Sequence, residues 1–432
     1  MGKEIQHKKH YGRFVFPNGL RLLTVPMAST ETVTVLVMVG TGSRYETKEI
    51  NGISHFLEHL MFKGTTKRPG ALDISEELDS IGADYNAFTS KEYTGYYIKC
   101  ASEKLDTAMD IIFDIFQNSK FDATELDRER GPVKEEINMW FDNPSRYVGT
   151  LYDELMFGDQ PLGWDIAGTK EHIDRFQRDD FVKYFTSHYV AGNTVVTIAG
   201  NFNEQRITKD VERFFDNIRE SEIIDPVPVV NHQKAPQLKL FHKKVEQVHI
   251  NFGFRSYSRF HPDYEVLEVM SILLGGGMSS RLFVEVREKR GWAYRIGTGT
   301  SAYRETGDFT TSAGLSTDKL ISALEIILKE HKRLLTESVT AKELTKIKDY
   351  IKGKFAIGLE PSDAQASFYS DQELLENMIQ TPEEKLKKID AVSSDDILRV
   401  ANDVFRSECL NLAVIGPESV KEEDLRKIVE SW

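Results

Sequence analysis

The residues best suited to chemistry lie together in the segment His55-Phe56-Leu57-Glu58-His59. Read as a helix, this segment places the two histidines on one face, because residues four apart follow each other along a helix surface. Two imidazoles at that spacing can bind one metal ion. Glu58 lies on the same face and can take a proton from a metal-bound water. The other face has the spacing of a core-facing stripe, with Ile53, Phe56, Leu57, Leu60 and Met61.

A second acidic helix offers a third ligand. Residues 124–141 are predicted to be helical, and Glu129 and Glu136 lie seven residues, about two turns, apart on one face. Glu136 is a candidate metal ligand and Glu129 a supporting carboxylate, although the adjacent Glu135 competes for the ligand role. Gly131-Pro132 lies between the two acids, and an interior proline removes a backbone hydrogen bond and kinks a helix. The sequence therefore does not determine whether Glu129 and Glu136 point in the same direction.

The elements that must position these residues alternate between strands and helices. Strands are predicted by runs of β-branched and aromatic residues, and helices by apolar residues three and four apart. The predicted strands are a hairpin over Phe14–Pro26, then Thr32–Val39, 82–89 and Tyr93–Cys100. Further helices are predicted at Ala71–Ile81 and Leu105–Phe116.

The chain repeats itself at an offset of half its length. Asp179-Asp180-Phe181 and the strand Thr194–Gly200 recur 216 residues later as Asp395-Asp396-Ile397 and Leu410–Gly416. Val33–Val39 maps by the same offset onto His249–Arg255. A constant offset at both ends of the half implies a duplicated domain.

The second copy lacks the candidate site. The positions that correspond to His55, Glu58, His59 and Glu136 hold residues unsuited to this chemistry, namely Ser271, Leu274, Gly275 and Lys352. The proline-punctuated stretch 223–237 resembles a linker. We therefore expect a catalytic zinc-binding domain at 1–222, a linker at 223–237 and a homologous domain without the zinc site at 238–432.

Composition restricts the remaining functional classes. The 432 residues carry a net charge of −13, and the pI is near 5.5, which disfavours a general nucleic-acid or anionic-membrane surface. No run approaches the roughly 18 apolar residues of a membrane span, and the N-terminal residues lack the apolar core of a signal peptide. Cys100 and Cys409 lie far apart in apolar contexts and indicate no disulfide framework. We expect a cytoplasmic protein with no nucleic-acid and no membrane partner.

Together these residues resemble the M16 (pitrilysin/insulinase) family of zinc metallopeptidases, the inverted zincins. The resemblance is to its single-length branch, which includes mitochondrial processing peptidases and bacterial relatives. It implies one Zn²⁺ per chain held by His55, His59 and Glu136, with Glu58 as general base and Glu129 in support; Mn²⁺ or Co²⁺ can substitute in vitro. It also implies the α+β LuxS/MPP-like metallohydrolase fold, with two homologous domains, each a mainly antiparallel sheet with helices packed on one face.

Further motifs are similar to those of the family. Asn86-Ala87-Phe88-Thr89 is similar to the edge strand that takes the substrate as an added strand, which favours extended peptides. Phe62, on the histidine face of its helix, is expected to contact the same substrate. Arg287 and Tyr294, in Val-Arg-Glu-Lys-Arg-Gly-Trp-Ala-Tyr, match the family's Arg…Tyr pair. The resemblance implies a carbonyl clamp for the arginine and an oxyanion donor for the tyrosine.

The resemblance implies a zinc endopeptidase that cleaves peptides or unstructured segments inside a closed chamber. In double-length members the Arg/Tyr domain faces the zinc domain, so we expect a homodimer in which Arg287 and Tyr294 of one chain approach the zinc of the other. One alternative is a non-catalytic processing-peptidase-like scaffold or substrate-binding subunit, and a less favoured one is amide hydrolysis of a small molecule. The complete ligand and base set favours the active peptidase.

Overall fold

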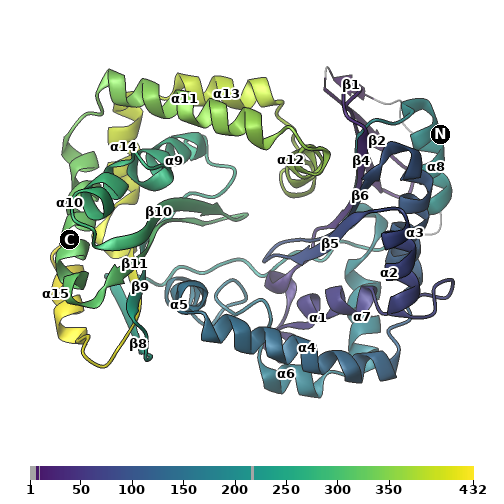
Figure 1. Ribbon diagram of the computed structural model, residues 1–432, viewed down its shortest axis with the longest axis horizontal. Coiled ribbons are helices and arrows are strands. Elements are labelled where there is room, and N and C mark those ends of the chain that lie inside the picture. Colours follow the sequence, from purple (N-terminus) through teal and green to yellow (C-terminus); the bar gives the residue numbers. More distant parts are fainter. Residues whose placement is uncertain (1–5, 9, 216–217) are drawn as a thin grey trace. The chain divides into compact units, whose positions relative to one another are not determined.

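The computed structural model describes residues 6–8, 10–215 and 218–432, which form two compact units. Unit 1 consists of Met1–Ile137, Asp165–Val227 and Ala356–Thr381, and unit 2 of Asn138–Trp164, Pro228–Phe355 and Pro382–Trp432. Each unit is a sheet with packed helices (Figure 1). This confirms the α+β class and the two homologous domains predicted from the sequence.

The units differ from the contiguous segments 1–222 and 238–432 expected from the sequence. Unit 1 takes in 356–381 from the second half of the chain, and unit 2 takes in 138–164 from the first half. The physical reason is that a helix from each of these segments packs on the sheet of the unit that takes it in. Residues 218–236, which cover most of the expected linker 223–237, contain no helix or strand.

The sheet of unit 1 has seven strands in the order β1-β2-β3-β7-β4-β6-β5. Neighbouring strands are antiparallel, except that β3 and β7 are parallel. β5 therefore lies at one edge of the sheet, paired with β6. The strands predicted between residues 14 and 100 are all present, and the full set is β1 Gln6–Lys8, β2 Tyr11–Val15, β3 Arg21–Pro26, β4 Thr32–Val39, β5 Asp84–Thr89, β6 Thr94–Ala101 and β7 Thr194–Gly200.

The helices of unit 1 include the two that carry the candidate ligands, α1 and α4. Helix α4 is continuous through Pro132, so the proline does not divide the segment that holds the two acids. The helices are α1 Ile53–Met61, α2 Ala71–Ser80, α3 Leu105–Asn118, α4 Ala123–Asp142, α6 Lys170–Arg175, α7 Arg178–His188, α8 Glu204–Phe215 and α12 Ser362–Leu375.

Both faces of this sheet are covered. Alternate residues of a strand point to opposite faces, and the alternate valines of β4, from Val33 to Val39, pack in one core with α1 and α3. The residues between them, Leu36 and Met38, pack with Ala366 and Tyr369 of α12 on the other face. Helices are therefore not confined to one face, because α12 from the second half of the chain covers the other.

Unit 2 repeats this architecture with five strands in the order β10-β11-β9-β12-β8, of which β8 and β12 are parallel. Its main core lies between the sheet and α10, α14 and α15, and α5 packs on the opposite face against Ala413 and Ile415. The strands are β8 Gln237–His242, β9 Gln247–Ser256, β10 Ala293–Ala302, β11 Gly307–Ser316 and β12 Leu410–Gly416. The helices are α5 Pro144–Phe157, α9 Tyr264–Ser271, α10 Leu320–Thr336, α11 Ala341–Gly358, α13 Pro382–Ala391, α14 Ser394–Val404 and α15 Glu422–Glu430.

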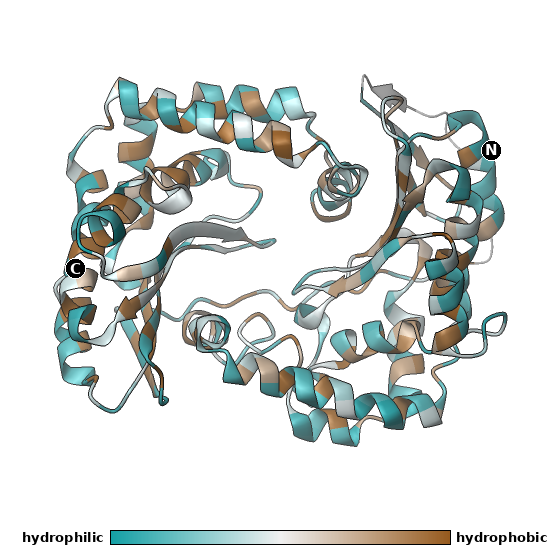
Figure 2. Cartoon of the chain, in the orientation of Figure 1, coloured by the Kyte–Doolittle hydropathy of each residue, from teal (hydrophilic) through white to brown (hydrophobic). Residues whose placement is uncertain are grey.

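The duplication predicted from the sequence is visible in the element bounds. The pairs β3/β8, β7/β12 and α7/α14 are each separated by the same 216 residues. The two strand pairs also hold corresponding places in the two strand orders. Helix α5 comes from the first half of the sequence but packs in unit 2, and α12 comes from the second half but packs in unit 1. These two helices also correspond approximately by this offset. Figure 2 shows hydrophilic and hydrophobic residues alternating along the helices of both units, as expected for helices with one face on a core.

Candidate metal centre and substrate strand

The N-terminus of helix α1 is fixed by Gly52 and by the side chain of Glu46. Gly52, just before it, has a φ of +98°, and a Cβ there would lie 2.6 Å from the carbonyl oxygen of Ala167, so only glycine fits. The buried carboxylate of Glu46 accepts hydrogen bonds from the backbone N–H of Gly52 and Ser54 and from the Asn51 amide, at 2.8, 2.8 and 2.9 Å. Burial raises the pKa of Glu46 to about 7, although these bonds oppose the shift. Glu46 thus fixes the start of the helix that carries the histidines.

The three candidate ligands converge. The Nε2 atoms of His55 and His59 lie 3.4 and 3.3 Å from the same carboxylate oxygen of Glu136, and the three ligand atoms all lie within 4.8 Å of one another. Among the described residues, no other set of histidine, cysteine and acidic side chains converges in this way, and Glu135 is not part of this one. The structure thus brings together the three residues predicted to bind metal, and Glu135 is not among the side chains that converge there.

The spacing and chemistry of these atoms fit Zn²⁺. In a tetrahedral site with bonds of about 2.0–2.1 Å, neighbouring ligand atoms are roughly 3.3 Å apart, which matches the 3.4 and 3.3 Å from the two histidines to Glu136. Two imidazoles and one carboxylate are also a ligand set of catalytic zinc sites, where the fourth position takes water or substrate. His55, His59 and Glu136 would therefore hold the ion.

Glu129 lies on the far side of the His59 ring from Glu136. Its Oε1 atom is 2.9 Å from Nδ1 of His59, and its Oε2 atom is 2.7 Å from Nζ of Lys63. Burial alone would lower the pKa of His59, but its hydrogen bonds with Glu129 and Glu136 outweigh burial and raise that pKa to about 9. The two carboxylates therefore make this point strongly attractive to a positive charge.

Glu58 lies between the histidines and β5. Its carboxylate accepts a hydrogen bond from the hydroxyl of Thr89, at the end of β5. Burial raises the pKa of Glu58, while the Thr89 hydroxyl and the two histidines oppose the shift. A carboxylate with a raised pKa is a stronger base than an ordinary surface glutamate, which suits proton transfer near neutral pH.

The predicted substrate strand is the edge strand of unit 1. β5 ends the strand order, so one edge of it bears no strand among the described residues. Asn86 is exposed, and Ala87 packs toward the core that contains α1. The ring of Phe88 lies over Gly95 of β6, and a Cβ added to Gly95 would come within 2.2 Å of that ring. Phe62 packs against the same core as Ala87, with its ring 6.2 Å from that of Tyr96.

The turn after β5 is fastened to the segment that follows β4. The backbone N–H groups of Ser43 and Arg44 donate to the carbonyl oxygens of Ser90 and Lys91, at 3.2 and 2.8 Å. The buried guanidinium of Arg44 pairs with the buried carboxylate of Glu92 in the same turn. Sequence reasoning missed this pair, as it missed Glu46, because neither contact follows from a local pattern.

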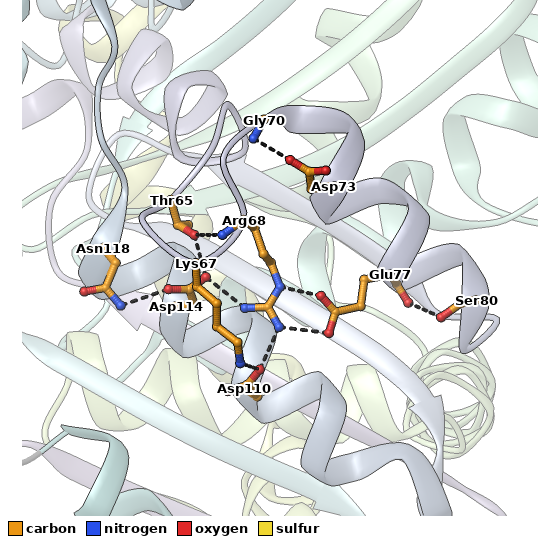
Figure 3. A network of polar contacts seen from close by, with 10 residues as sticks. All are labelled: Thr65, Lys67, Arg68, Gly70, Asp73, Glu77, Ser80, Asp110, Asp114 and Asn118. Carbon is orange, nitrogen blue, oxygen red and sulfur yellow. Dashed lines mark hydrogen bonds and ion pairs between the residues drawn. The ribbon is translucent and has the colours of Figure 1, made fainter.

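The loop after α1 is held by Arg68 (Figure 3). This side chain is 3% exposed, and its guanidinium contacts Glu77 of α2 at 2.6 and 2.9 Å and Asp110 and Asp114 of α3 at 2.6 and 2.8 Å. Thr65 completes the network through its hydroxyl, which donates to Asp114 at 2.6 Å. The loop is thereby fixed to two helices of unit 1.

Arg287 and Tyr294 lie in unit 2 and contact each other. The Arg287 guanidinium is 5.3 Å from the centre of the Tyr294 ring, and Tyr294, on β10, is 77% exposed. The two residues of the predicted pair therefore lie next to each other in this unit. At the positions that correspond to the metal ligands, unit 2 offers no convergent set among its described residues, and Lys352 forms an ion pair with Asp390 at 2.6 Å.

Fold and site together define a class of two-domain α+β proteins in which one domain carries a His-His-Glu set able to hold a metal ion. The insulinase (peptidase family M16) model matches residues 21–170, and the model of the M16 inactive domain matches residues 175–351. The chain therefore belongs to the M16 peptidase family. The inactive-domain match agrees with the loss of the ligand set in the second half.

Relatives cover nearly the whole chain. It is 36% identical to the uncharacterized zinc protease YmxG of Bacillus subtilis, over 94% of this chain and 98% of the relative. It is 34% identical to an uncharacterized zinc protease of Rickettsia felis, over 96% and 99%. A crystal structure of a protease from Helicobacter pylori matches with a TM-score of 0.89 at 24% identity, over 96% of this chain and 100% of that one.

A more distant structural match is a chain of complex III2 from Candida albicans. Its TM-score is 0.82 at 19% identity, over 96% of this chain and 99% of that one, which supports the fold alone. None of the helices in the described residues is long and apolar enough to cross a membrane.

Proposed function

We propose that the chain is a zinc-dependent endopeptidase that cleaves extended peptides or unstructured polypeptide segments. The observation that carries this proposal is the convergence of the ligand atoms of His55, His59 and Glu136, all within 4.8 Å of one another and with both histidine nitrogens 3.3–3.4 Å from one Glu136 oxygen. The names of the relatives, which are zinc proteases, support it.

The chemistry divides between the ion and the protein. When bound, zinc supplies a Lewis acid that lowers the pKa of water toward neutrality and polarises a peptide carbonyl. Glu58 accepts the proton of the attacking water and delivers it to the leaving amine. The Thr89 hydroxyl, which donates to Glu58, orients the carboxylate for this transfer.

The edge strand offers the substrate a backbone to pair with. A peptide added alongside β5 would gain backbone hydrogen bonds that depend little on its sequence, with Asn86 to Thr89 in contact with it. The same strand reaches Glu58 through Thr89, so the bound peptide would pass close to the general base. A folded substrate cannot add a strand in this way, which favours unstructured segments.

The decisive experiment uses two neighbouring glutamates. Purified wild type, E58Q, E136Q and the control E135Q are compared for zinc content and for cleavage of an unstructured fluorogenic peptide pool, with and without o-phenanthroline. We expect E136Q to lose both zinc and cleavage, E58Q to keep zinc while cleavage falls about 10²–10⁴-fold, and E135Q to resemble wild type. If wild type binds zinc but cleaves no peptide, the alternative function of a non-catalytic, substrate-binding subunit would be favoured. If wild type binds no zinc, the alternative function of a non-catalytic scaffold would be favoured.

We further propose that the active form is a homodimer in which Arg287 and Tyr294 of one chain act at the zinc of the other. Tyr294 is exposed and Arg287 partly exposed, in a unit without a convergent ligand set among its described residues, which supports this proposal. Mixing E58Q with Y294F chains should restore about a quarter of wild-type activity, since half of the dimers are mixed and each has one intact site. Mixed dimers as inactive as their parents would contradict it. The cytoplasmic location expected from the sequence stays a prediction.

A further inference from the structure

Glu129 joins two groups through separate oxygens. Oε1 is 2.9 Å from Nδ1 of His59, and Oε2 is 2.7 Å from Nζ of Lys63. The Glu129 side chain is 9% exposed and that of Lys63 25%, so water competes little for either contact. Lys63 therefore has a defined partner next to the metal centre, although nothing in the sequence singled it out.

This arrangement determines which nitrogen of His59 carries a proton. A lysine ammonium can only donate, so its contact holds Oε2 of Glu129 as an acceptor and turns Oε1 toward the imidazole. Oε1 is then also an acceptor, so Nδ1 of His59 must donate to it. In the neutral ring, Nε2 is left with a lone pair, and this is the atom 3.3 Å from Glu136.

The backbone on either side of Lys63 is anchored. The carbonyl oxygen of Met61 accepts a hydrogen bond from the Ser119 hydroxyl at 3.0 Å, and that of Gly64 accepts one from the N–H of Lys120 at 3.1 Å. Thr65, next in the chain, belongs to the Arg68 network of Figure 3. The ammonium therefore extends from a fixed base, and a fixed donor restricts Glu129 more than a mobile surface lysine can.

We propose that Lys63 is a positioning residue of the metal centre, which acts through Glu129 to hold His59 with its Nε2 atom ready to bind the ion. The inference rests on the proposed zinc site and extends it by one residue. The histidine ligand is the group that contacts the metal, and Lys63 affects metal binding without touching the ion. Partners of this kind typically change metal affinity about 10–100-fold when they are removed.

The test measures zinc affinity, with a chromophoric chelator as competitor at fixed pH and ionic strength. K63M should weaken zinc binding about 10–100-fold, and K63R, which keeps a donor, should recover most of the loss. The matched control is K67M, because Lys67 lies in the same loop and pairs with Asp110, away from the ligands. K67M should bind zinc as wild type does.

A double-mutant cycle tests whether Lys63 acts through Glu129. If it does, K63M should cause no further loss of zinc affinity in an E129Q background. Thermal unfolding of the metal-free variants checks that each is folded. Equal zinc affinities of wild type and K63M, or additive losses in the cycle, would overturn the inference.

These outcomes are separable from the proposed function, because affinity is measured without cleavage. A chain that binds zinc but cleaves no peptide would refute the peptidase and still allow Lys63 to be tested. A wild-type chain that binds no zinc would overturn both.

Discussion

Single residues in this protein acquire their roles from the atoms that face them. Glu129 and Glu136 share a face of α4, yet the first contacts Nδ1 of His59 and the second contacts Nε2. The two acids therefore lie on opposite sides of one ring, where the proposed zinc site would use Glu129 to orient the ring and Glu136 to bind the ion beside it. Pro132 lies between them without interrupting the helix. Chemically identical side chains two turns apart thus contact different atoms of the same histidine.

Asp308 in unit 2 shows the same dependence on surroundings. This residue of β11 is 6% exposed, and burial raises its pKa to about 7, with a further contribution from Asp153. The Thr310 hydroxyl donates to it at 2.5 Å. Because the folded chain holds this proton more tightly than the unfolded chain, the stability that Asp308 contributes falls as pH rises from about 4 to 7.

We therefore predict that the free energy of unfolding of wild type, relative to D308N, decreases by about 2–3 kcal/mol between pH 5 and pH 8. Asparagine can still accept from Thr310 but does not titrate. Urea unfolding at the two pH values measures the difference. D318N is the control, because the Asp318 side chain is 72% exposed, and it should show no such dependence. A difference independent of pH would show that Asp308 stays ionised.

At the scale of elements, β5 depends on more than its pairing with β6. Its turn is packed against the segment after β4 so closely that a Cβ on Gly42 would lie 2.2 Å from the carbonyl oxygen of Ser90. The buried pair of Arg44 and Glu92 ties the same two segments together. The edge strand proposed to receive the substrate is thus held firmly at the end nearest Glu58.

G42A is predicted to destabilise the chain by about 1–3 kcal/mol, because the added methyl group forces two backbone segments apart. The comparison is G353A in α11, where a Cβ would meet no atom within 4 Å. Alanine favours helix more than glycine, so G353A should stabilise by about 0.5–1 kcal/mol. Chemical denaturation of both variants measures the two effects. Equal stability of G42A and wild type would show that the contact is loose.

At the scale of the whole chain, each half covers a sheet face with a helix taken from the other half. In unit 1, α12 places Tyr369 over the apolar face of β4 and buries Glu373, whose carboxylate pairs with Arg13 through two hydrogen bonds of 2.8 Å. The first half of the chain is therefore incomplete as a folding unit, because the second half supplies this cover.

A fragment of residues 1–222 should expose this sheet face, bind a hydrophobic dye and unfold without cooperativity. Addition of a peptide of residues 356–381 should restore cooperative unfolding, because it returns α12 and the partner of Arg13. Calorimetry and dye fluorescence measure both states, and a scrambled peptide is the control. A fragment that folds cooperatively without the peptide would show that α12 contributes little to the core.

The sequence by itself determined the class of the site and much of the architecture. His55, Glu58 and His59 lie within one helix, so their common face follows from helix geometry, and strands and helices follow from local periodicity. The duplication followed from a constant offset, which needs no three-dimensional information. The family resemblance drew on the same residues, and the comparisons confirmed it.

The family resemblance favoured Glu136 over Glu135, and the tertiary structure places the Glu136 carboxylate beside the two histidines. Only the tertiary structure revealed the contacts of Glu46, of Lys63 and of Arg44 with Glu92. These contacts join groups on different elements, and their partners are set by how the chain folds back on itself. The same holds for α5 and α12, whose amphipathic patterns do not say which sheet they cover. Local periodicity fixes which face of an element is apolar, whereas the choice of partner depends on long-range packing.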